Sequence, residues 1–334
     1  MTTPSTLEAF APRRVALLGA TGTIGQATLR ALRAQGHEVV CFVRDARNNR
    51  MGLNLSDPGV VLRKVNLLDP ASVAQEGFAD ETFQAVVSCM ASRSGLPRDA
   101  WAVDHQAHLN VLQACATAGV QQFVLLSAIC VQKPQLAFQH AKLAFEQALM
   151  DSGLTYAIVR PTAFFKSLSG QIGRLQQGKP FWVFGDGRLT ACKPIADDDL
   201  GEFLAGCLTR PERHNQILPV GGPGPAITPL EQAQMLAELL GTPLRIRRMP
   251  VAFMNALIRV MDALGPVIPS LRDKAELARI GRYYGTESML VIDPVTGQYD
   301  ESLTPSWGQR TLREHYRQLL QGEISVDLGE HSVF

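Results

Sequence analysis

The sequence has little of what marks a membrane-spanning, secreted or nucleic-acid-binding protein. No apolar run reaches the roughly 18 residues that a membrane helix needs. The stretch from Met1 to Pro12 lacks the apolar segment of a secretory signal. Acidic and basic residues nearly cancel, with 32 Lys and Arg against 31 Asp and Glu. This balance gives no electrostatic footprint for nucleic acid, so we expect no nucleic-acid partner.

The chain also lacks the close cysteine pairs of a metal or disulfide framework. Its six cysteines include no Cys-x-x-Cys pair, which argues against a zinc ribbon or an iron–sulfur cluster and favours free thiols in a reducing compartment. His105 and His108 have the spacing of two ligands on one helix face, but no third ligand is apparent. We therefore expect no metal site and a structural role for this pair.

The chain has the composition of a globular enzyme, and its predicted strands and helices alternate regularly. With 334 residues, of which 46% are hydrophobic, it is long enough for about two domains. Helical patterns separate short apolar runs that read as strands at residues 14–19, 37–43, 60–65, 85–89, 122–127, 155–161 and 216–220. This alternation predicts an α/β fold with a doubly wound parallel sheet of the Rossmann type.

A glycine-rich turn follows the first of these strands and precedes a helix. Gly19, Gly22 and Gly25 have the spacing Gly-x-x-Gly-x-x-Gly. The first glycine permits a tight turn, the second lets backbone approach a pyrophosphate, and the third lets the helix pack close to the strand. Free amides at the helix N-terminus then face the phosphates, which predicts a dinucleotide site. The intervening residues Thr21, Thr23 and Ile24 are included in this site.

The end of the second strand indicates which dinucleotide binds. NAD enzymes usually carry Asp or Glu about 20 residues after the fingerprint, where it binds the ribose 2′-hydroxyl. This strand ends instead at Arg44, with Arg47 and Arg50 following. Because a guanidinium suits a 2′-phosphate, we expect NADPH as the cofactor, with a solvated basic loop as the alternative.

Later strand ends supply further expected cofactor contacts. Asn66 and Leu67 end the third strand where the adenine would lie. Met90 and Ala91 follow the fourth strand and would pass under the ribose.

These features resemble the short-chain dehydrogenase/reductase superfamily, in its extended or atypical branch, over roughly residues 14–220. Leu125-Leu126-Ser127 carries the resemblance together with the fingerprint and the sixth strand. The family has a Tyr-x-x-x-Lys pair about eleven residues past the serine, and the matching stretch here runs from Phe138 to Lys142. The resemblance implies that Ser127 and Lys142 are catalytic and that Lys142 holds the nicotinamide ribose.

Phe138 stands where the family has its tyrosine, and this departure changes the expected chemistry. Phenylalanine cannot transfer a proton, so standard carbonyl reduction is not supported while cofactor binding is retained. Either the protein only senses NADP(H), or it delivers hydride to an acceptor that needs no alkoxide proton donor. A vinyl group conjugated to a large aromatic ring fits the second alternative, because the ring delocalises the charge.

The C-terminal half resembles the NADPH-dependent divinyl chlorophyllide 8-vinyl reductases of photosynthetic organisms. Residues 280–290, Ile-Gly-Arg-Tyr-Tyr-Gly-Thr-Glu-Ser-Met-Leu, carry this resemblance, with supporting matches at 160–167, 183–187, 192–200 and 221–223. The resemblance implies that the 8-vinyl group of divinyl chlorophyllide, or of divinyl protochlorophyllide, is reduced to ethyl with NADPH in (bacterio)chlorophyll biosynthesis. The substrate would be a Mg-containing tetrapyrrole.

The same resemblance implies a substrate site built from aromatic side chains. One of the two adjacent tyrosines would supply the second proton. The residues at 271–284 also indicate a helix with a basic face, formed by Arg272, Lys274, Arg279 and Arg282, which is consistent with a contact to a propionate of the pigment or with a solvated charged face. The implied substrate-binding residues are Phe138, Phe164, Phe165, Arg282, Tyr283 and Tyr284, with both tyrosines also in a catalytic role. Further implied cofactor contacts are Pro161, Thr162 and Phe164.

We expect two interleaved domains and a short tail. Residues 12–163 plus 195–220 would form the NADP-binding domain, 164–194 plus 221–322 a smaller α/β substrate-binding part, and 323–334 the tail. Residues 181–184 and 189–194 are expected to be strands around a Gly-Asp-Gly turn.

An amphipathic helix is expected at 251–266. Its apolar stripe is consistent with a core-facing helix, a wall for a flat pigment, which we favour, or a peripheral membrane contact.

Two alternatives to a vinyl reductase stay open at this stage. One is a non-catalytic NADP(H)-sensing regulator, and the other is a sugar-nucleotide-modifying extended family member, which the missing tyrosine disfavours. We expect a location in the bacterial cytoplasm, since a plastid protein would need a transit peptide and none is seen.

Overall fold

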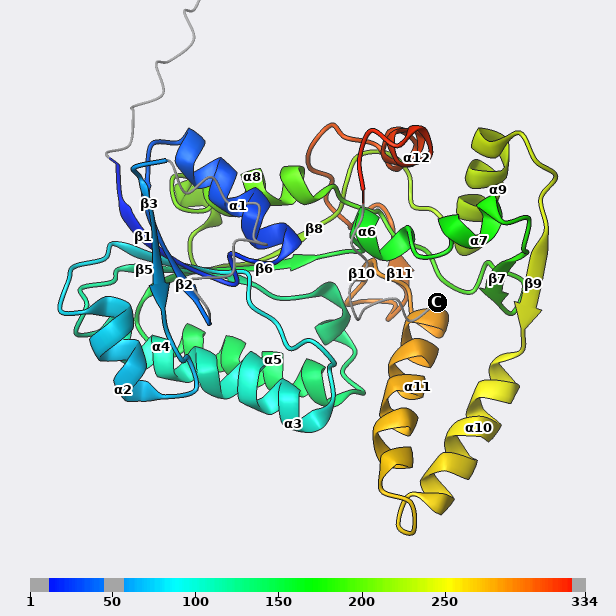
Figure 1. Cartoon of the computed structure of the whole chain (residues 1–334), viewed down its shortest axis with the longest axis horizontal. Coiled ribbons are helices and arrows are strands. Elements are labelled where there is room, and N and C mark those ends of the chain that lie inside the picture. Colours follow the sequence, from blue (N-terminus) through cyan, green and yellow to red (C-terminus); the bar gives the residue numbers. More distant parts are fainter. Residues whose placement is uncertain (1–11, 45–56, 326–334) are drawn as a thin grey trace, which may run out of the picture.

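A seven-stranded parallel sheet forms the centre of the computed structural model, which describes residues 12–44 and 57–325 (Figure 1). The strand order is β3-β2-β1-β4-β5-β6-β8, and every neighbouring pair runs parallel. The order reverses between β1 and β4, which is where doubly wound sheets bind nucleotides. The predicted Rossmann-type fold is therefore confirmed. The strands are β1 Arg14–Leu18, β2 Glu38–Val43, β3 Val60–Lys64, β4 Ala85–Ser88, β5 Gln122–Leu126, β6 Thr155–Pro161 and β8 Gln216–Val220.

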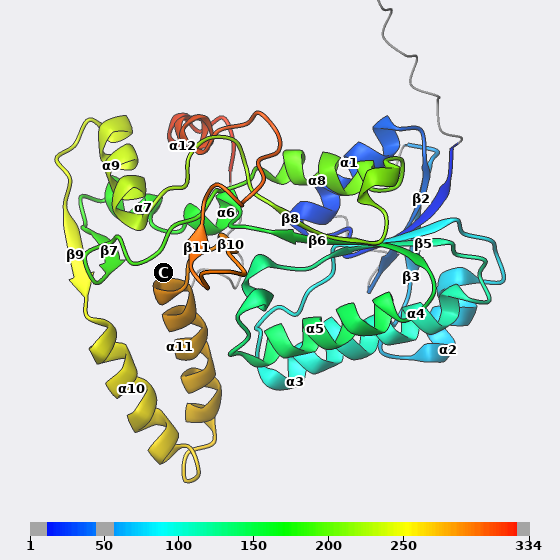
Figure 2. The same cartoon turned by 180° about the vertical axis from the view of Figure 1, so that it is seen from behind.

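Helices cover both faces of this sheet, as the nearly continuous apolar strands require (Figure 2). On one face, α1 (Thr23–Ala34) packs against α8 (Asp197–Gly206). The other face is covered by α2 (Pro70–Ser72), α3 (Pro97–Ala100), α4 (His108–Cys115) and α5 (Ala137–Met150), with π-helical turns at Val73–Phe78 and Trp101–Ala107. Each face has its own buried apolar cluster.

A second, smaller core lies beyond the carboxyl edge of the sheet. Here β7 (Phe181–Phe184) pairs in parallel with β9 (Ile246–Met249). The helices around this pair are α6 (Phe165–Leu168), α7 (Ile172–Gln176), α9 (Pro229–Leu240) and α12 (Leu312–Gln321). The expected strand at 189–194 is wrong, because this segment makes only isolated bridges, from Cys192 to Ile227 and to Met289. The neighbour of β7 is thus supplied by β9, a segment distant in sequence.

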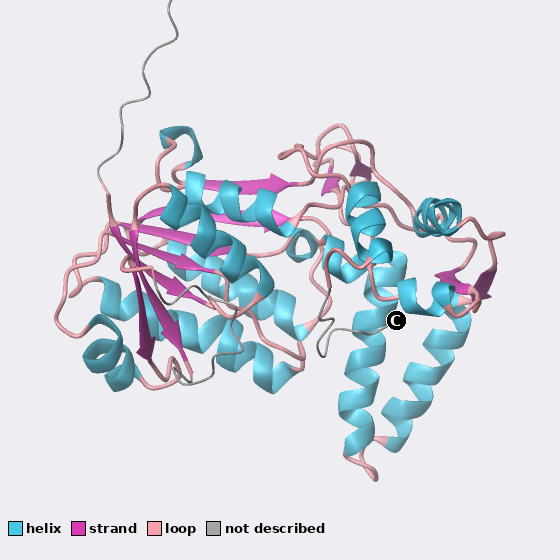
Figure 3. Cartoon of the chain, turned by 45° about the horizontal axis from the view of Figure 1, so that its top comes forward, coloured by secondary structure: helices cyan, strands magenta, loops and turns pink. Residues whose placement is uncertain are grey.

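Two helices form a hairpin that projects from the rest of the molecule (Figures 1 and 3). It consists of α10 (Val251–Leu264) and α11 (Ser270–Thr286), and a small pair of strands, β10 (Val291–Ile292) and β11 (Tyr299–Asp300), follows it. Ile258 is the buried residue of α10, whereas Phe253 is 59% exposed. A core-facing role for α10 is therefore wrong. None of the helices in the described ranges is long and apolar enough to cross a membrane.

Candidate active site

The glycine turn between β1 and α1 has the shape of a phosphate cradle. Gly19 has a φ of +74° and lies so close to the end of β4 that a Cβ there would meet the Cys89 carbonyl carbon at 2.7 Å. A Cβ on Gly25 would come within 2.0 Å of the Gly19 oxygen, so this glycine sets the approach of helix to strand. Gly22 is exposed, and a Cβ there would meet only the Gly19 oxygen, at 3.4 Å. No side chain caps α1, so its first amides are free for a pyrophosphate, and the residues fit a dinucleotide.

The adenosine end of the site would lie at the ends of β2 and β3. Arg44 directly follows β2 and is exposed, while Arg47 and Arg50 lie outside the described residues. The turn after β3 is held in place by two hydrogen bonds: the Asn66 amide donates to Ser72 Oγ at 2.9 Å, and Asn110 Nδ2 donates to the Leu67 carbonyl at 2.9 Å. Since β2 and β3 are neighbours, this turn and Arg44 share one edge of the sheet.

Met90 and Ala91 follow β4 on the other side of the glycine turn, above a buried histidine. The Met90 amide donates to Ser88 Oγ, which lies 2.7 Å from Nε2 of His108. His108 Nδ1 donates to the Val103 carbonyl, which sets its tautomer. Burial, with a smaller effect of the Lys142 charge, lowers the pKa of His108 to about 4. In the described part of the chain, no three His, Cys, Asp or Glu side chains gather as a metal site.

Lys142 forms a buried ion pair that the sequence did not indicate. Its Nζ lies 2.9 Å from Oδ1 of Asp104, and the two side chains are 11% and 0% exposed. The Ser92 amide donates to the same oxygen, while Asp104 Oδ2 is buried and has no hydrogen-bond partner among the described residues. Asp104 is the counter-charge of Lys142, whose motif has Phe138 in the tyrosine position. No spacing rule connects residues 38 positions apart, so only the fold reveals the pair.

Ser127 lies at the end of β5, as predicted, but its hydroxyl is held inside the protein. It donates to Oε1 of Glu146 on α5, and the guanidinium of Arg160 pairs with the same carboxylate. The serine is 5% exposed. This arrangement indicates a structural role within a buried ion-pair network.

The two adjacent tyrosines face different surroundings. Tyr283 is 1% exposed, and its hydroxyl lies within hydrogen-bond distance of the Cys130 and Lys133 carbonyls, at 2.9 and 3.0 Å. Tyr284 is 42% exposed as a residue, although its hydroxyl reaches inward to 4.0 Å from the Cys130 sulfur. Burial raises the pKa of both hydroxyls above the usual value. The expected stacking surface on Tyr283 is therefore wrong, because its ring belongs to the core.

The three phenylalanines of the predicted substrate site also divide between core and surface. Phe138 is 7% exposed and packs in the same cluster as Tyr283. Phe165 is 3% exposed and lies against the His315 ring, with 5.2 Å between centroids, so the expectation that it stacks on a ligand is corrected. Phe164 is half-buried at the start of α6 and keeps accessible surface.

Three remaining predicted residues are placed as follows. Pro161 and Thr162 are buried at the end of β6, where the Thr162 hydroxyl donates to the Lys193 carbonyl. Arg282 on α11 donates to Oδ1 of Asn255 on α10, at 3.2 Å. The hairpin thus uses this arginine internally.

A side-chain position that the fingerprint rules do not include also reaches the glycine turn. Nζ of Lys166, on α6, lies 3.2 Å from Oγ1 of Thr23, the first residue of α1. The sequence shows Lys166 only as one residue of a matching stretch, without a spacing that assigns it a role.

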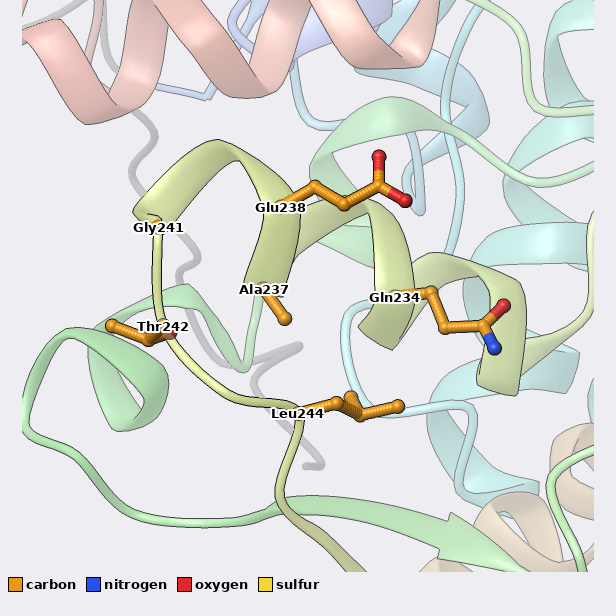
Figure 4. Close-up of a pocket in the computed structure, with 6 residues that line it drawn as sticks. All are labelled: Gln234, Ala237, Glu238, Gly241, Thr242 and Leu244. Carbon is orange, nitrogen blue, oxygen red and sulfur yellow. The ribbon is translucent and has the colours of Figure 1, made fainter.

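A surface depression of about 350 Å³ lies beside α9 and the segment that follows it (Figure 4). It is lined by Gln234, Ala237, Glu238, Gly241, Thr242 and Leu244. Its one charged side chain, Glu238, pairs with Arg313. Because it offers no other titratable group and no contact with the carboxyl edge of the sheet, it is not part of the cofactor site.

Comparison with known proteins identifies the relatives of this chain. A family described as NAD(P)H-binding matches residues 19–211, which confirms the prediction of a nicotinamide cofactor. The chloroplastic divinyl chlorophyllide a 8-vinyl-reductase of Oryza sativa subsp. indica is 46% identical over 332 residues, covering 96% of this chain and 82% of the relative. The Arabidopsis thaliana protein of the same name is 43% identical over 333 residues, covering 95% and 79%.

Among solved structures, the NADPH-dependent quinone oxidoreductase of Escherichia coli complexed with NADPH has the same fold. Its TM-score is 0.66 at 19% identity, covering 92% of this chain and 99% of that one.

These relatives also correct one expectation. The prediction of a bacterial cytoplasmic location is wrong, because the similar reductases are chloroplastic proteins of plants. The length of the match, rather than the fold alone, assigns the family. The chain belongs to the divinyl chlorophyllide a 8-vinyl-reductases, a group within the NAD(P)H-binding family.

Proposed function

We propose that this chain reduces the 8-vinyl group of divinyl chlorophyllide, or of its protochlorophyllide counterpart, to an ethyl group. The observation that carries the proposal is the family match over 96% of the chain. The buried Phe138 supports it, because a site without the family's tyrosine suits a C=C acceptor better than a carbonyl. By the same reasoning, a sugar-nucleotide-modifying activity is disfavoured.

We assign the cofactor's groups to three places along the carboxyl edge of the sheet. The free amides of α1 would hold the pyrophosphate, Arg44 the 2′-phosphate, and Lys142 the ribose next to the nicotinamide. NADPH supplies the hydride when bound. Asp104 pairs with the Lys142 ammonium and holds it in place in a buried site.

The remaining proton is assigned to Tyr284. Tyr284 is 42% exposed, and its hydroxyl is protonated at neutral pH because burial raises its pKa above the usual value. Tyr283 is excluded from this role because two backbone carbonyls surround its hydroxyl. Phe164 and the exposed part of Tyr284 would then contact the pigment ring.

The direct experiment mixes pure protein, NADPH and divinyl chlorophyllide, and follows the absorption shift that accompanies loss of one vinyl group. Stoichiometric consumption of NADPH with this shift is expected. A protein that binds NADPH but consumes none would be the NADP(H)-sensing regulator instead. Tyr284→Phe is expected to slow turnover without changing NADPH affinity, whereas Tyr283→Phe serves as the matched control for the neighbouring hydroxyl.

The proposal also covers the division of the chain into two parts and its location in the cell. We propose the division into 12–163 plus 195–220 and 164–194 plus 221–322, with a tail at 323–334. The separate buried clusters of the sheet and of the smaller part support it, and a further cluster that contains Phe138 and Tyr283 joins the two parts. The chloroplastic relatives support a plastid location.

Peripheral membrane contact through the α10–α11 hairpin is part of the same proposal. Val260 and Val267 are 55% and 81% exposed on the projecting hairpin. Arg272 and Lys274, near its tip, have no ion pair within the described residues. An apolar surface flanked by cations suits an anionic lipid surface.

A further inference from the structure

Lys166 comes from outside the strand–turn–helix unit and still reaches the phosphate cradle. It lies in the first turn of α6, directly after the sheet's sixth strand and its connecting loop. Its Nζ is 3.2 Å from the Thr23 hydroxyl at the start of α1. Thr21, Gly22 and Thr23 are all exposed around that point. A flexible cation is thus placed beside the free amides that would face a pyrophosphate.

The backbone that carries Lys166 is fixed by its neighbours. Phe165 is buried against His315, and the Phe165 amide donates to the Ile195 carbonyl at 3.3 Å. The Ser169 hydroxyl donates back to the Phe165 carbonyl at 2.8 Å, which closes the short helix. The backbone around Lys166 is therefore held by two hydrogen bonds and by a buried ring.

Among the described residues, no carboxylate oxygen lies within 4 Å of the Lys166 ammonium. Thr23 is a neutral partner, and within the described residues Lys166 forms no ion pair. Asp197, at the start of α8, is near enough that the Lys166 charge opposes the burial that raises the pKa of this carboxyl to about 6. Arg30, the other cation nearby, pairs with Asp198. The charge on Lys166 therefore remains available to an anionic ligand.

We propose that Lys166 binds the cofactor's pyrophosphate beside the amides of α1. The pyrophosphate would be held by the helix amides and, next to them, by a lysine of the proposed substrate-binding part. Binding of the cofactor would thus join the two parts of the chain through one charge-assisted contact. This deepens the proposed function and rests on it only through the identity of the cofactor.

The test separates the pyrophosphate from the 2′-phosphate by using fragments of NADPH. Calorimetric titrations of NADPH, ADP-ribose and adenosine 2′-phosphate would be compared for the wild type, Lys166→Met and Lys166→Arg. Lys166→Met is expected to weaken NADPH and ADP-ribose about tenfold and to leave adenosine 2′-phosphate unchanged. Lys166→Arg should recover most of the loss. Lys179→Met is the matched control, since the Lys179 ammonium donates to Gln177 in the turn after α7.

Two results would overturn the assignment. One is an unchanged ADP-ribose affinity in Lys166→Met, and the other is an equal loss for adenosine 2′-phosphate, which would indicate a general charge effect. Thermal unfolding of each variant shows whether the fold is intact. Turnover of divinyl chlorophyllide, measured in parallel, tests the proposed function separately, because the fragment titrations need no pigment.

Discussion

Helices α1 and α10 are both amphipathic but lie in very different surroundings. Helix α1 buries seven of its 12 residues against the sheet and α8. Helix α10 has 14 residues, and Ile258 is the one that is buried. In the first helix an apolar stripe meets a sheet that is itself apolar, whereas in the second it meets mainly one neighbouring helix, α11. An apolar stripe therefore predicts that one face of a helix packs against another element, but it does not identify that element or the extent of the contact.

The largest expected difference in stability between the sheet with α1 and the α10–α11 hairpin comes from adding a side chain to a glycine in each. Gly25→Ala would place a Cβ 2.0 Å from a backbone oxygen, so we expect a loss of about 5 kcal/mol or more in unfolding free energy, or no folded protein. Gly265→Ala in the hairpin is the matched control, because its new Cβ would meet the flexible Arg272 side chain at 3.1 Å. Denaturant unfolding measures both, and equal losses would contradict the comparison.

The next effect concerns the buried charge pair at the cofactor site. Asp104→Ala leaves the Lys142 ammonium buried without its counter-charge, which we expect to cost about 3–5 kcal/mol of stability. In the hairpin, Asp262→Ala breaks a partly exposed pair with Arg279 and is expected to cost at most about 1 kcal/mol. A small loss in Asp104→Ala, with NADPH affinity intact, would show that Lys142 needs no partner.

We expect the preference for NADPH over NADH to depend on residues at the edge of the sheet and not on the hairpin. Arg44→Glu should weaken NADPH about 100-fold and change NADH little, because it replaces a 2′-phosphate partner with a like charge. Equilibrium titration of both cofactors measures the ratio. Arg259→Glu, in α10, is the control and should change neither affinity. Equal use of both cofactors by the wild type would remove Arg44 from the site.

The pH dependence of stability should also separate the two regions. The pKa of His108 is held at about 4, below the 6.5 of the unfolded chain, so only the unfolded state takes up a proton between these values. Stability present above pH 6.5 is therefore lost as the pH falls, by about 2 kcal/mol between pH 7 and 5. Asp197 has the opposite effect on stability. Burial raises its pKa to about 6, so folding disfavours its charged form and this carboxyl makes the protein more stable as the pH falls through that value.

The variant His108→Gln isolates the histidine's share, because Asp197 is unchanged in it. Denaturant unfolding at several pH values should give a shallower fall toward acid for the variant. Identical slopes for variant and wild type would show that His108 does not hold its low pKa in solution. No histidine lies in the hairpin, so hairpin variants should keep the wild-type slope.

Substitutions at the tip of the α10–α11 hairpin are expected to have the smallest effect on stability. They should have the largest effect on membrane binding. Replacing the exposed Val267 and Ile268 by Asn should change the unfolding free energy by no more than about 0.5 kcal/mol. The same variant should lose flotation with anionic vesicles, while wild type floats with anionic but not zwitterionic vesicles. Unchanged flotation of the variant, or no flotation of wild type, would contradict the membrane contact.

Most of the nucleotide-binding region could be predicted from local sequence because local rules dominate there. The glycine spacing sets the turn, β-branched runs set the strands, and the short connections set the parallel order. The expected strand at 189–194 failed because pairing with a neighbour depends on distant residues: β9, far along the chain, provides the partner of β7. Strand propensity alone does not choose among such partners.

The sequence by itself determined the Rossmann-type sheet, the cofactor cradle and the loss of the family's tyrosine at Phe138. Each depends on residue type or on spacing within a few positions of the chain. Only the tertiary structure decided which polar groups meet. It paired Asp104 with Lys142, placed Lys166 at Thr23, turned Tyr283 into the core, and left α10 exposed. These contacts join segments far apart in sequence, and their energies depend on burial and on distance, which no local pattern specifies.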